Sequence, residues 1–562
     1  MIGIPRELFD ETERLASTWE SEDKIRRLWS GDSSIWSGST EREQLGWLSV
    51  IGQQRQDLDS LLALKQDVED SRFEYAVLLG MGGSSLCPEV LRHTFGRMSL
   101  APDLRVLDST DPAQIEATDK EINYERTLFI VSSKSGNTLE SEILSRYFFE
   151  RVSTEFSPNP GQRFVAVTDP GSPLDELAVA RKFRYVFHGQ SNIGGRFSAL
   201  SHFGLVPAAV MGLDVSRLLN SAELMLAKCG ETKSVRENPA AMLGLILGAA
   251  AKLGRDKITF IMSPSIRMFG AWLEQLLAES TGKSGAGLIP VNGEVVGSPE
   301  RYGEDRCFVY LRDKRVEVGD QDVKVKRLEE AGLPVVHLSL TDLYDLGGEF
   351  FRWEFAAAVV GAILRINPFD QPDVEDSKVR TRRFAQVYER NGELPMEEPL
   401  ACLGKISVYG KTDTGEASEK GGTGSSLAEI VAWHLGRVVP GDYVGFMAYI
   451  EKSQGNVEVL QRLRGLVRDR LGVATCADFG PRFLHSTGQV HKGGPNTGVF
   501  FQITCSDEID ISVPGKDYSF GVVKMAQARG DFEALINRDR RVLRIHVAGS
   551  VLEGLQQFAG VV

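Results

Sequence analysis

The sequence has few cysteines and few histidines for its 562 residues, six and eight respectively. No two cysteines form a Cys-x-x-Cys pair, so neither a disulfide framework nor a cysteine-rich zinc site is indicated. No block rich in lysine and arginine stands out, and the net charge is −13, which argues against general binding to nucleic acid or to an anionic membrane. The negative net charge does not exclude a small anionic ligand, because a local cradle of hydrogen-bond donors can override it.

Long hydrophobic runs are missing too. The most apolar run, residues 240–251, has about a dozen residues, short of the roughly 20 that span a bilayer. The N-terminus, MIGIPRELFDETERL, is typical of an acidic helix and lacks the apolar core of a signal peptide. We therefore expect a soluble, cytoplasmic protein. Its length indicates about three to four domains.

Residues 126–150, RTLFIVSSKSGNTLESEILSRYFFE, contain the most informative pattern. The apolar run 128–131 predicts a buried parallel strand, and an amphipathic helix is predicted after the polar residues SSKSGNT. Hydroxyls, one lysine and one glycine at a helix N-terminus can form a cradle for a dianion, because free N–H groups and the helix dipole point at the same place. An ordinary capped helix after a strand is the alternative.

Strands and helices alternate from residue 75 onward, which predicts an α/β fold with doubly wound parallel sheets. The strands expected in the first unit are 76–79, 105–107, 128–131, 164–167 and 185–187. After a linker at about 214–235, a second unit is expected, with strands 257–262, 307–311 and 334–340 and helices 238–253, 268–280 and 350–364. Residues 400–425 are interpreted as a linker or mobile loop, and a third α/β region should follow, with strands 444–450, 499–504 and 543–547 and a helix at 457–471.

This pattern predicts four segments. They are an N-terminal helical segment (1–70), a first doubly wound domain (71–220), a second one (235–395) and an extra C-terminal α/β region (400–562). Ligands of such sheets bind beyond the carboxyl ends of the strands, and two similar units facing each other would form a cleft for a small molecule.

The loop GMGGSS, residues 80–85, follows the first expected strand. It could belong to a dinucleotide site with Asp108 as a ribose acceptor, but Ser85 replaces the third glycine of that fingerprint. Two glycines that let the backbone approach an anion, with the hydroxyl of Ser84, fit a monophosphate better.

Two further patterns place ionisable groups near the predicted cleft. Arg196 lies in the turn GGRFS, where a fixed cation could meet substrate charge. Gln275 and Glu279 are four residues apart and should project from one helix face. Glu279 lies near the helix C-terminus, where the dipole would raise its pKa toward the range of a general base. A surface ion pair and a solvated carboxylate are the alternatives.

Two more segments complete the set. NPFDQPDVEDSK, residues 367–378, carries two prolines and is interpreted as a loop. RFLHSTGQ, residues 482–489, places His485 among small polar residues, which favours it over the histidines in apolar strands as a group for chemistry.

Together these segments resemble the glucose-6-phosphate isomerase family over most of residues 75–500. The similarity is carried by GMGGSS, SSKSGNT, SNIGGRFSALSHFG, AESTGK and NPFDQPDVEDSK. Some pieces are shared with other sugar-isomerase (SIS) domains, but GGRFS together with FDQ-x-x-VE-x-x-K is more specific. FLHSTGQVHKGGPNTGVFFQI is most similar to the isomerase half of bifunctional transaldolase/glucose-6-phosphate isomerases, although no barrel-length segment for a transaldolase is present.

The resemblance implies two SIS-type domains and roles for single residues. Glu279 matches the base that moves a proton between C1 and C2 through a cis-enediolate, and Arg196 matches the residue that stabilises the enediolate. Lys378 and His485 resemble groups used in ring opening, the histidine coming from the neighbouring subunit in those dimers. The substrate-binding matches are Gly83, Ser84, Ser133, Lys134, Ser135, Thr138, Gln275 and Gln371.

The implied activity is the reversible isomerisation of glucose 6-phosphate and fructose 6-phosphate in glycolysis and gluconeogenesis, without metal or organic cofactor and in a homodimer. One departure concerns the histidine, which precedes FDQ in the usual family order and follows it here by more than 100 residues. His491 is therefore a competitor of His485. Asp373 also stands where the family commonly has glycine. A non-catalytic sugar-phosphate sensor and a dinucleotide-dependent enzyme are the alternative functions.

Overall fold

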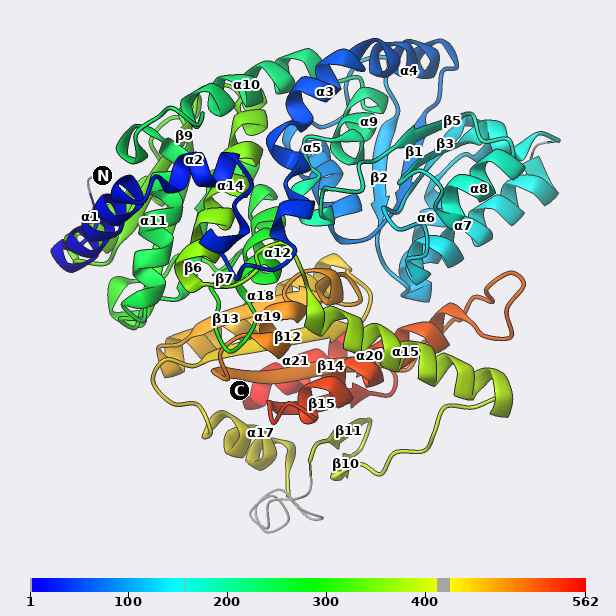
Figure 1. Ribbon diagram of the computed structural model, residues 1–562. Helices are drawn as coiled ribbons and strands as arrows, with labels where there is room; N and C mark the ends of the chain where they lie inside the picture. The colour runs from blue at the N-terminus through cyan, green and yellow to red at the C-terminus, as the bar shows by residue number, and fades with distance from the viewer. Residues whose placement is uncertain (1–2, 157, 412–424) are drawn as a thin grey trace.

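Three sheets flanked by helices make up the computed structural model, which describes residues 3–156, 158–411 and 425–562 (Figure 1). In Figure 1 the N-terminal helices run from the left edge over the top of the part that contains two parallel sheets, and the C-terminal region lies below this part. None of the helices in these three ranges is both long and apolar enough to cross a membrane.

The N-terminal segment is helical, as predicted. Its helices are α1 (Arg6–Ser21), α2 (Lys24–Trp29), α3 (Val50–Gln56) and α4 (Leu58–Asp70). Helix α1 packs on α11 (Pro239–Lys252) of the second unit, and α4 packs on α9 (His202–Val210) of the first. Trp47 is fully buried, with its ring 5.5 Å from that of Phe197, so this segment supports the turn that carries Arg196.

The first sheet is parallel, with the order β2-β1-β3-β4-β5, and all five strands agree with the sequence prediction to within about two residues. They are β1 (Tyr75–Leu79), β2 (Asp103–Leu107), β3 (Thr127–Ser132), β4 (Phe164–Thr168) and β5 (Tyr185–His188). The inner strands β1, β3 and β4 are almost entirely buried, because helices cover both faces. Those helices are α5 (Leu86–Phe95), α6 (Pro112–Glu121), α7 (Leu139–Arg151), α8 (Pro173–Ala180) and α9.

The second sheet is also parallel, in the order β7-β6-β8-β9. Its strands are β6 (Lys257–Met262), β7 (Ile289–Val291), β8 (Arg306–Asp313) and β9 (Val335–Leu340), packed with α11, α12 (Phe269–Thr281), α13 (Asp320–Glu330) and α14 (Leu346–Leu364). The predicted linker at 214–235 is wrong for most of its length, since α10 (Val215–Lys228) forms there. Leu218, Leu219 and Ala222 recur at helical spacing and are buried, mainly against α14.

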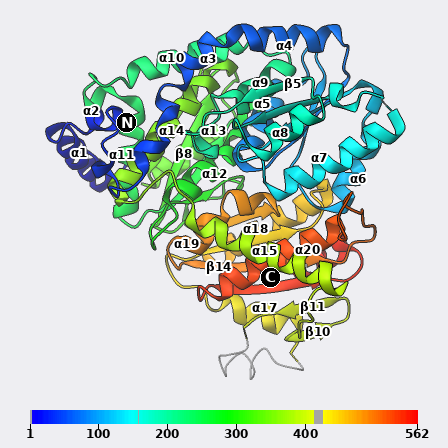
Figure 2. The same cartoon turned by 45° about the vertical axis from the view of Figure 1, so that its right-hand side comes forward.

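The C-terminal region, at the bottom of Figure 2, contains a mixed sheet, whose strand order is β10-β11-β15-β14-β12-β13. Its strands are β10 (Ala401–Leu403), β11 (Ile406–Tyr409), β12 (Tyr443–Tyr449), β13 (Ala474–Phe479), β14 (Gly498–Cys505) and β15 (Arg541–Val547). The helices are α17 (Leu427–Leu435), α18 (Gln454–Leu471), α19 (Gly488–Gly493), α20 (Phe520–Ile536) and α21 (Val551–Val561). The antiparallel hairpin β10–β11 corrects the linker expected at 400–425, of which residues 412–424 lie outside the described residues.

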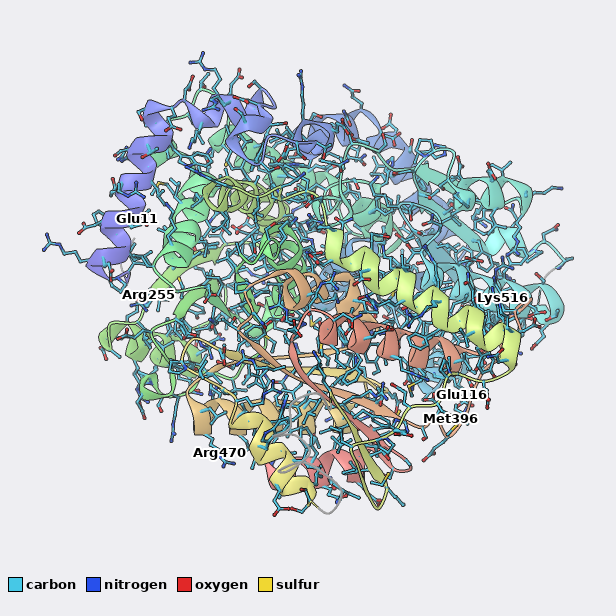
Figure 3. The ribbon with its side chains drawn as sticks, turned by 60° about the horizontal axis from the view of Figure 1, so that its bottom comes forward. Glu11, Glu116, Arg255, Met396, Arg470 and Lys516 are labelled. Atoms are coloured by element: carbon cyan, nitrogen blue, oxygen red, sulfur yellow. The ribbon has the colours of Figure 1, made fainter. Side chains whose placement is uncertain are left out.

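Helix α15 (Pro372–Asn391) connects the second sheet to this region and packs along α20 (Figure 3). The predicted loop at residues 367–378 is therefore a loop only as far as Gln371. Pro372 occupies the first helical position, where its missing N–H costs no hydrogen bond. Residues 372–378, including Lys378, therefore belong to the first part of α15.

Candidate functional site

A cleft of about 590 Å³ lies where the three sheets meet. Its walls come from the loops after β1 and β3, from α12, from α15 and from the turn that carries His485. Of the twelve residues to which the family resemblance gives a catalytic or substrate-binding role, all except Ser133 line this cleft: Gly83, Ser84, Lys134, Ser135, Thr138, Arg196, Gln275, Glu279, Gln371, Lys378 and His485.

The loop after β1 packs tightly against the turn before Arg196. A Cβ atom at Gly83 would lie 2.0 Å from the carbonyl oxygen of Gly195, so only glycine permits this approach. Asp108, considered as a ribose acceptor, is buried and accepts hydrogen bonds from Ser85 (3.3 Å) and Arg482 (2.6 Å). Its carboxylate is committed to the protein, which disfavours the dinucleotide interpretation.

The loop between β3 and α7 leaves the start of α7 without a side-chain cap. Thr138 occupies the N-cap position, but its hydroxyl accepts from Oγ of buried Ser133 at 3.1 Å instead of capping the helix. Ser133 therefore supports Thr138 from behind. Since the first backbone N–H groups of a helix have no intrahelical acceptor, this end can receive an anion. Lys134 lies beside it in an ion pair with Asp169.

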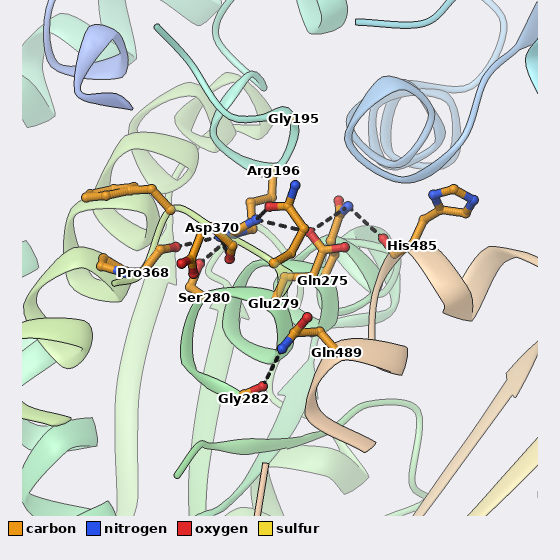
Figure 4. Close-up of polar contacts among 12 residues, drawn as sticks. Gly195, Arg196, Gln275, Glu279, Ser280, Gly282, Pro368, Asp370, His485 and Gln489 are labelled. Atoms are coloured by element: carbon orange, nitrogen blue, oxygen red, sulfur yellow. Dashed lines mark hydrogen bonds and ion pairs between the residues drawn. The ribbon is translucent and has the colours of Figure 1, made fainter. Parts of the chain in front are cut away.

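Arg196 is fully buried, and its guanidinium is fixed by four neighbours (Figure 4). It donates to Oγ of Ser280 (2.9 Å), to the carbonyl oxygens of Pro368 (2.6 Å) and Asp370 (2.9 Å), and to Oε1 of Gln371 (2.8 Å). The contact to Oε2 of Glu279 is longer, 3.4 Å. The cation is thus held next to the carboxylate while most of its donors are used elsewhere.

Burial raises the pKa of Glu279 above 4.5, although the positive charge of Arg196 opposes the shift. The sequence predicted the same direction of the pKa shift. The main cause is burial, however, whereas the sequence argument relied on the helix dipole. The predicted neighbour on the same helix face is also in place, since Gln275 donates to Glu279 (3.4 Å) and to the carbonyl oxygen of His485 (2.7 Å). Its own Oε1 is buried without a partner, so it is free to accept from a ligand hydroxyl.

His485 reaches the cleft from the C-terminal region. Its Nε2 lies 2.9 Å from Oε1 of Glu140 in the first turn of α7, and Gln527 donates to the same oxygen at 2.7 Å. His491 is placed differently: it is buried between the rings of Tyr443 and Phe500, and neither ring nitrogen has a partner. Of the two histidines left open by the sequence, only His485 lines the cleft.

Lys378 lies on α15 with its Nζ 2.7 Å from Glu375. Lys283, the last residue of AESTGK, instead holds the loop before α15. It donates to the carbonyl oxygens of Asn367 (2.7 Å) and Asp370 (2.5 Å) and to Oδ1 of Asp370 (2.7 Å). Burial lowers the pKa of Lys283 to about 8. This lysine fixes the segment that carries Gln371.

Four charged or amide side chains of the cleft lie outside the motifs that carried the sequence reasoning and were missed by it: Glu140, Asp169, Arg382 and Gln527. Glu140 could have been found, because it lies two residues after Thr138 in the first turn of the predicted helix. Gln527 had no such signal, since α20 was not predicted. Within the described ranges, no group of three or more His, Cys, Asp or Glu residues is arranged to hold a metal ion.

Comparison with known proteins identifies relatives. A phosphoglucose isomerase family model matches residues 70–295. The chain is 34% identical over 378 residues to the glucose-6-phosphate isomerase of Thermosynechococcus vestitus, covering 58% of this chain and 70% of that protein. It is 27% identical over 407 residues to the probable glucose-6-phosphate isomerase of Methanococcus maripaludis, covering 65% and 90%.

A solved structure of a hypothetical protein from Thermus thermophilus superposes with a TM-score of 0.59 at 23% identity, covering 68% of this chain and 99% of that one. This likeness concerns the fold. The family assignment comes from the sequence match to the Thermosynechococcus enzyme, which extends over more than two thirds of that enzyme. The chain therefore belongs to the phosphoglucose isomerase family.

Proposed function

We propose that this protein interconverts D-glucose 6-phosphate and D-fructose 6-phosphate by ring opening and proton transfer through a cis-enediolate. The observation that carries the proposal is a buried carboxylate of raised pKa, Glu279, next to a fixed guanidinium, Arg196, in a cleft that also contains an anion cradle. A base and a fixed cation at one place are what proton transfer α to a carbonyl requires.

The phosphate would bind at the uncapped start of α7. Ser135, Thr138 and the loop after β1 offer hydroxyls and backbone N–H groups there. Binding the unreactive end of the sugar phosphate positions the reacting carbons, so this energy can be used for orientation at C1 and C2.

Ring opening requires a proton on the ring oxygen and removal of a proton from the anomeric hydroxyl. His485, held by Glu140, and Lys378 are the groups proposed for this step. An imidazole can give or take a proton near neutral pH, and a carboxylate partner fixes the orientation of its ring.

Glu279 would then take the proton from C2 of the open-chain aldose and return it to C1, while a second proton moves from the C2 hydroxyl to the C1 oxygen, and the reverse reaction uses the same path. The enediolate formed between these steps is negatively charged. Arg196 is held by Ser280, Gln371 and two backbone carbonyls, so its charge does not need to reorganise as the enediolate forms.

The expectation of a homodimer rests on the family resemblance, and that of a cytoplasmic location rests on the short apolar runs of the sequence; we include both in the proposal on these grounds. The proposed steps use only side chains and backbone groups of the protein.

The first test is conversion of fructose 6-phosphate to glucose 6-phosphate, followed with a coupled dehydrogenase and with EDTA present. We expect robust turnover that EDTA does not reduce. Absence of turnover in a folded protein that still binds a sugar phosphate would overturn the proposal and favour a sugar-phosphate sensor.

A further inference from the structure

The charged groups of the cleft are matched in pairs, with one exception. Each carboxylate that lines the cleft faces a basic group: Asp169 faces Lys134, Glu279 faces Arg196, Glu375 faces Lys378 and Glu140 faces His485. Arg382 also lines the cleft, but no hydrogen bond or ion pair within the described residues involves its guanidinium. It is therefore a cation of the cleft wall that is available to a ligand.

The position of Arg382 on α15 places it toward the phosphate cradle. Gln371, just before α15, contacts Arg196, and Arg382 lies about 16 Å further along the helix axis at 1.5 Å per residue. Beyond it, Ala385 and Tyr388 belong to the apolar cluster that includes Leu139, the first residue of α7. Helix α15 thus extends from the catalytic residues toward the helix end that forms the cradle.

Arg382 also shares a helix face with Lys378, four residues earlier, and both side chains line the cleft. Lys378 is paired with Glu375, and in the cradle itself Lys134 is paired with Asp169. A dianion in the cradle would therefore meet hydroxyls, N–H groups and a lysine that is already neutralised. The positive charge that remains for the dianion is that of Arg382, on the opposite wall of the cleft.

We propose that Arg382 is a further substrate-binding residue, which contacts the phosphate of the sugar from the wall facing the α7 cradle. This inference rests on the proposed function and specifies how its substrate is held. A guanidinium can donate two parallel hydrogen bonds to phosphate oxygens. The ammonium group of a lysine cannot form this bidentate contact. Because the contact is made at the unreactive end of the substrate, it strengthens binding of ground state and transition state alike.

The test compares Arg382→Ala with Arg383→Ala as the matched control. Arg383 is the next residue of α15, pairs with Glu533 and does not line the cleft. For Arg382→Ala we expect KM for fructose 6-phosphate to rise about 10-fold with kcat within about twofold, because charge-assisted hydrogen bonds are lost only in binding. The KM of Arg382→Lys should lie between those of Arg382→Ala and the wild type. The KM and kcat of Arg383→Ala should match those of the wild type.

Competition by inorganic phosphate gives a second readout. Its inhibition constant should rise in Arg382→Ala in parallel with KM. An unchanged KM and inhibition constant in Arg382→Ala, or an equal rise in Arg383→Ala, would overturn the proposal. A wild-type protein without isomerase activity would instead contradict the proposed function, and calorimetric titration of phosphate into wild type and Arg382→Ala would still decide the role of Arg382.

Discussion

Nε2 of His485 lies 2.9 Å from Oε1 of Glu140, so a residue of the C-terminal region and the first turn of α7 meet at the cleft. Burial alone would raise the pKa of Glu140, but the charge of His485 and its hydrogen bond lower the pKa overall. Glu140 is therefore a carboxylate that holds the imidazole. Gln527 donates to the same oxygen and fixes the carboxylate in turn.

Exchange between the α and β anomers of glucose 6-phosphate separates ring opening from proton transfer, because anomer exchange needs only the first step. We expect His485→Ala to lose about 10²-fold in both anomer exchange and isomerisation, within the range of general acid–base catalysis. Glu140→Gln should show a smaller loss in both, as expected for a positioning residue. Glu279→Gln should lose isomerisation while anomer exchange, measured by NMR, continues.

The buried His491 provides the control for this experiment. His491→Phe keeps an aromatic ring between Tyr443 and Phe500 and removes no hydrogen bond of the histidine ring. The His491→Phe variant should keep near-normal rates of both anomer exchange and isomerisation. A loss of anomer exchange in His491→Phe, with His485→Ala active, would reverse the assignment.

The pKa of Glu279 predicts a pH dependence. Only the ionised carboxylate can accept the proton from carbon, and burial raises its pKa above 4.5. The acidic limb of kcat/KM should therefore lie at higher pH than for a solvated glutamate. Arg196 lowers this pKa, so Arg196→Met should move the limb to still higher pH, besides reducing the maximum rate. A limb that stays in place or moves to lower pH in Arg196→Met would show that Glu279 does not govern it.

The sequence predicted well those features that depend on local patterns. Apolar runs such as residues 128–131 indicated the strands, and the four-residue spacing of Gln275 and Glu279 placed both on one helix face. Helix α10 and strand β7 were missed because the first runs into the polar residues 230–238 and the second is only three residues long.

Contacts between distant segments could not be predicted from the sequence. The pairing of His485 with Glu140 spans 345 residues, and no local pattern indicates that the C-terminal region packs against the first sheet. The contact depends on buried polar groups from both sides. Arg482, three residues before His485, donates to Asp108 at 2.6 Å and also pairs with Glu89.

Arg482 therefore attaches the C-terminal region to the cleft. All three side chains are buried, so Arg482→Met would remove the direct cationic partner of Asp108 and leave Glu89 with longer contacts such as that to Lys452 (3.8 Å). It should destabilise the protein by about 3–5 kcal/mol in urea unfolding. Adding Glu89→Gln and Asp108→Asn should restore most of this stability. Lys326→Met, in an exposed pair with Glu330, is the control and should change stability by less than about 1 kcal/mol. A cost for Arg482→Met no larger than the control would show that the buried ion pairs do not hold the region in place.

Gln275 connects the proposed base Glu279 with the proposed ring-opening residue His485 of the same chain. Its amide donates to the carboxylate of Glu279 and to the carbonyl oxygen of His485. This geometry predicts that each chain supplies its own histidine. In the proposed homodimer this can be tested: Glu279→Gln and His485→Ala chains with different tags are co-expressed, and the mixed dimer is purified through both tags. If the histidine came from the partner, one of the two sites would be intact and the hybrid would keep about half of wild-type turnover. With His485 in the same chain, every site carries one defect, and the hybrid should be no more active than the two single variants.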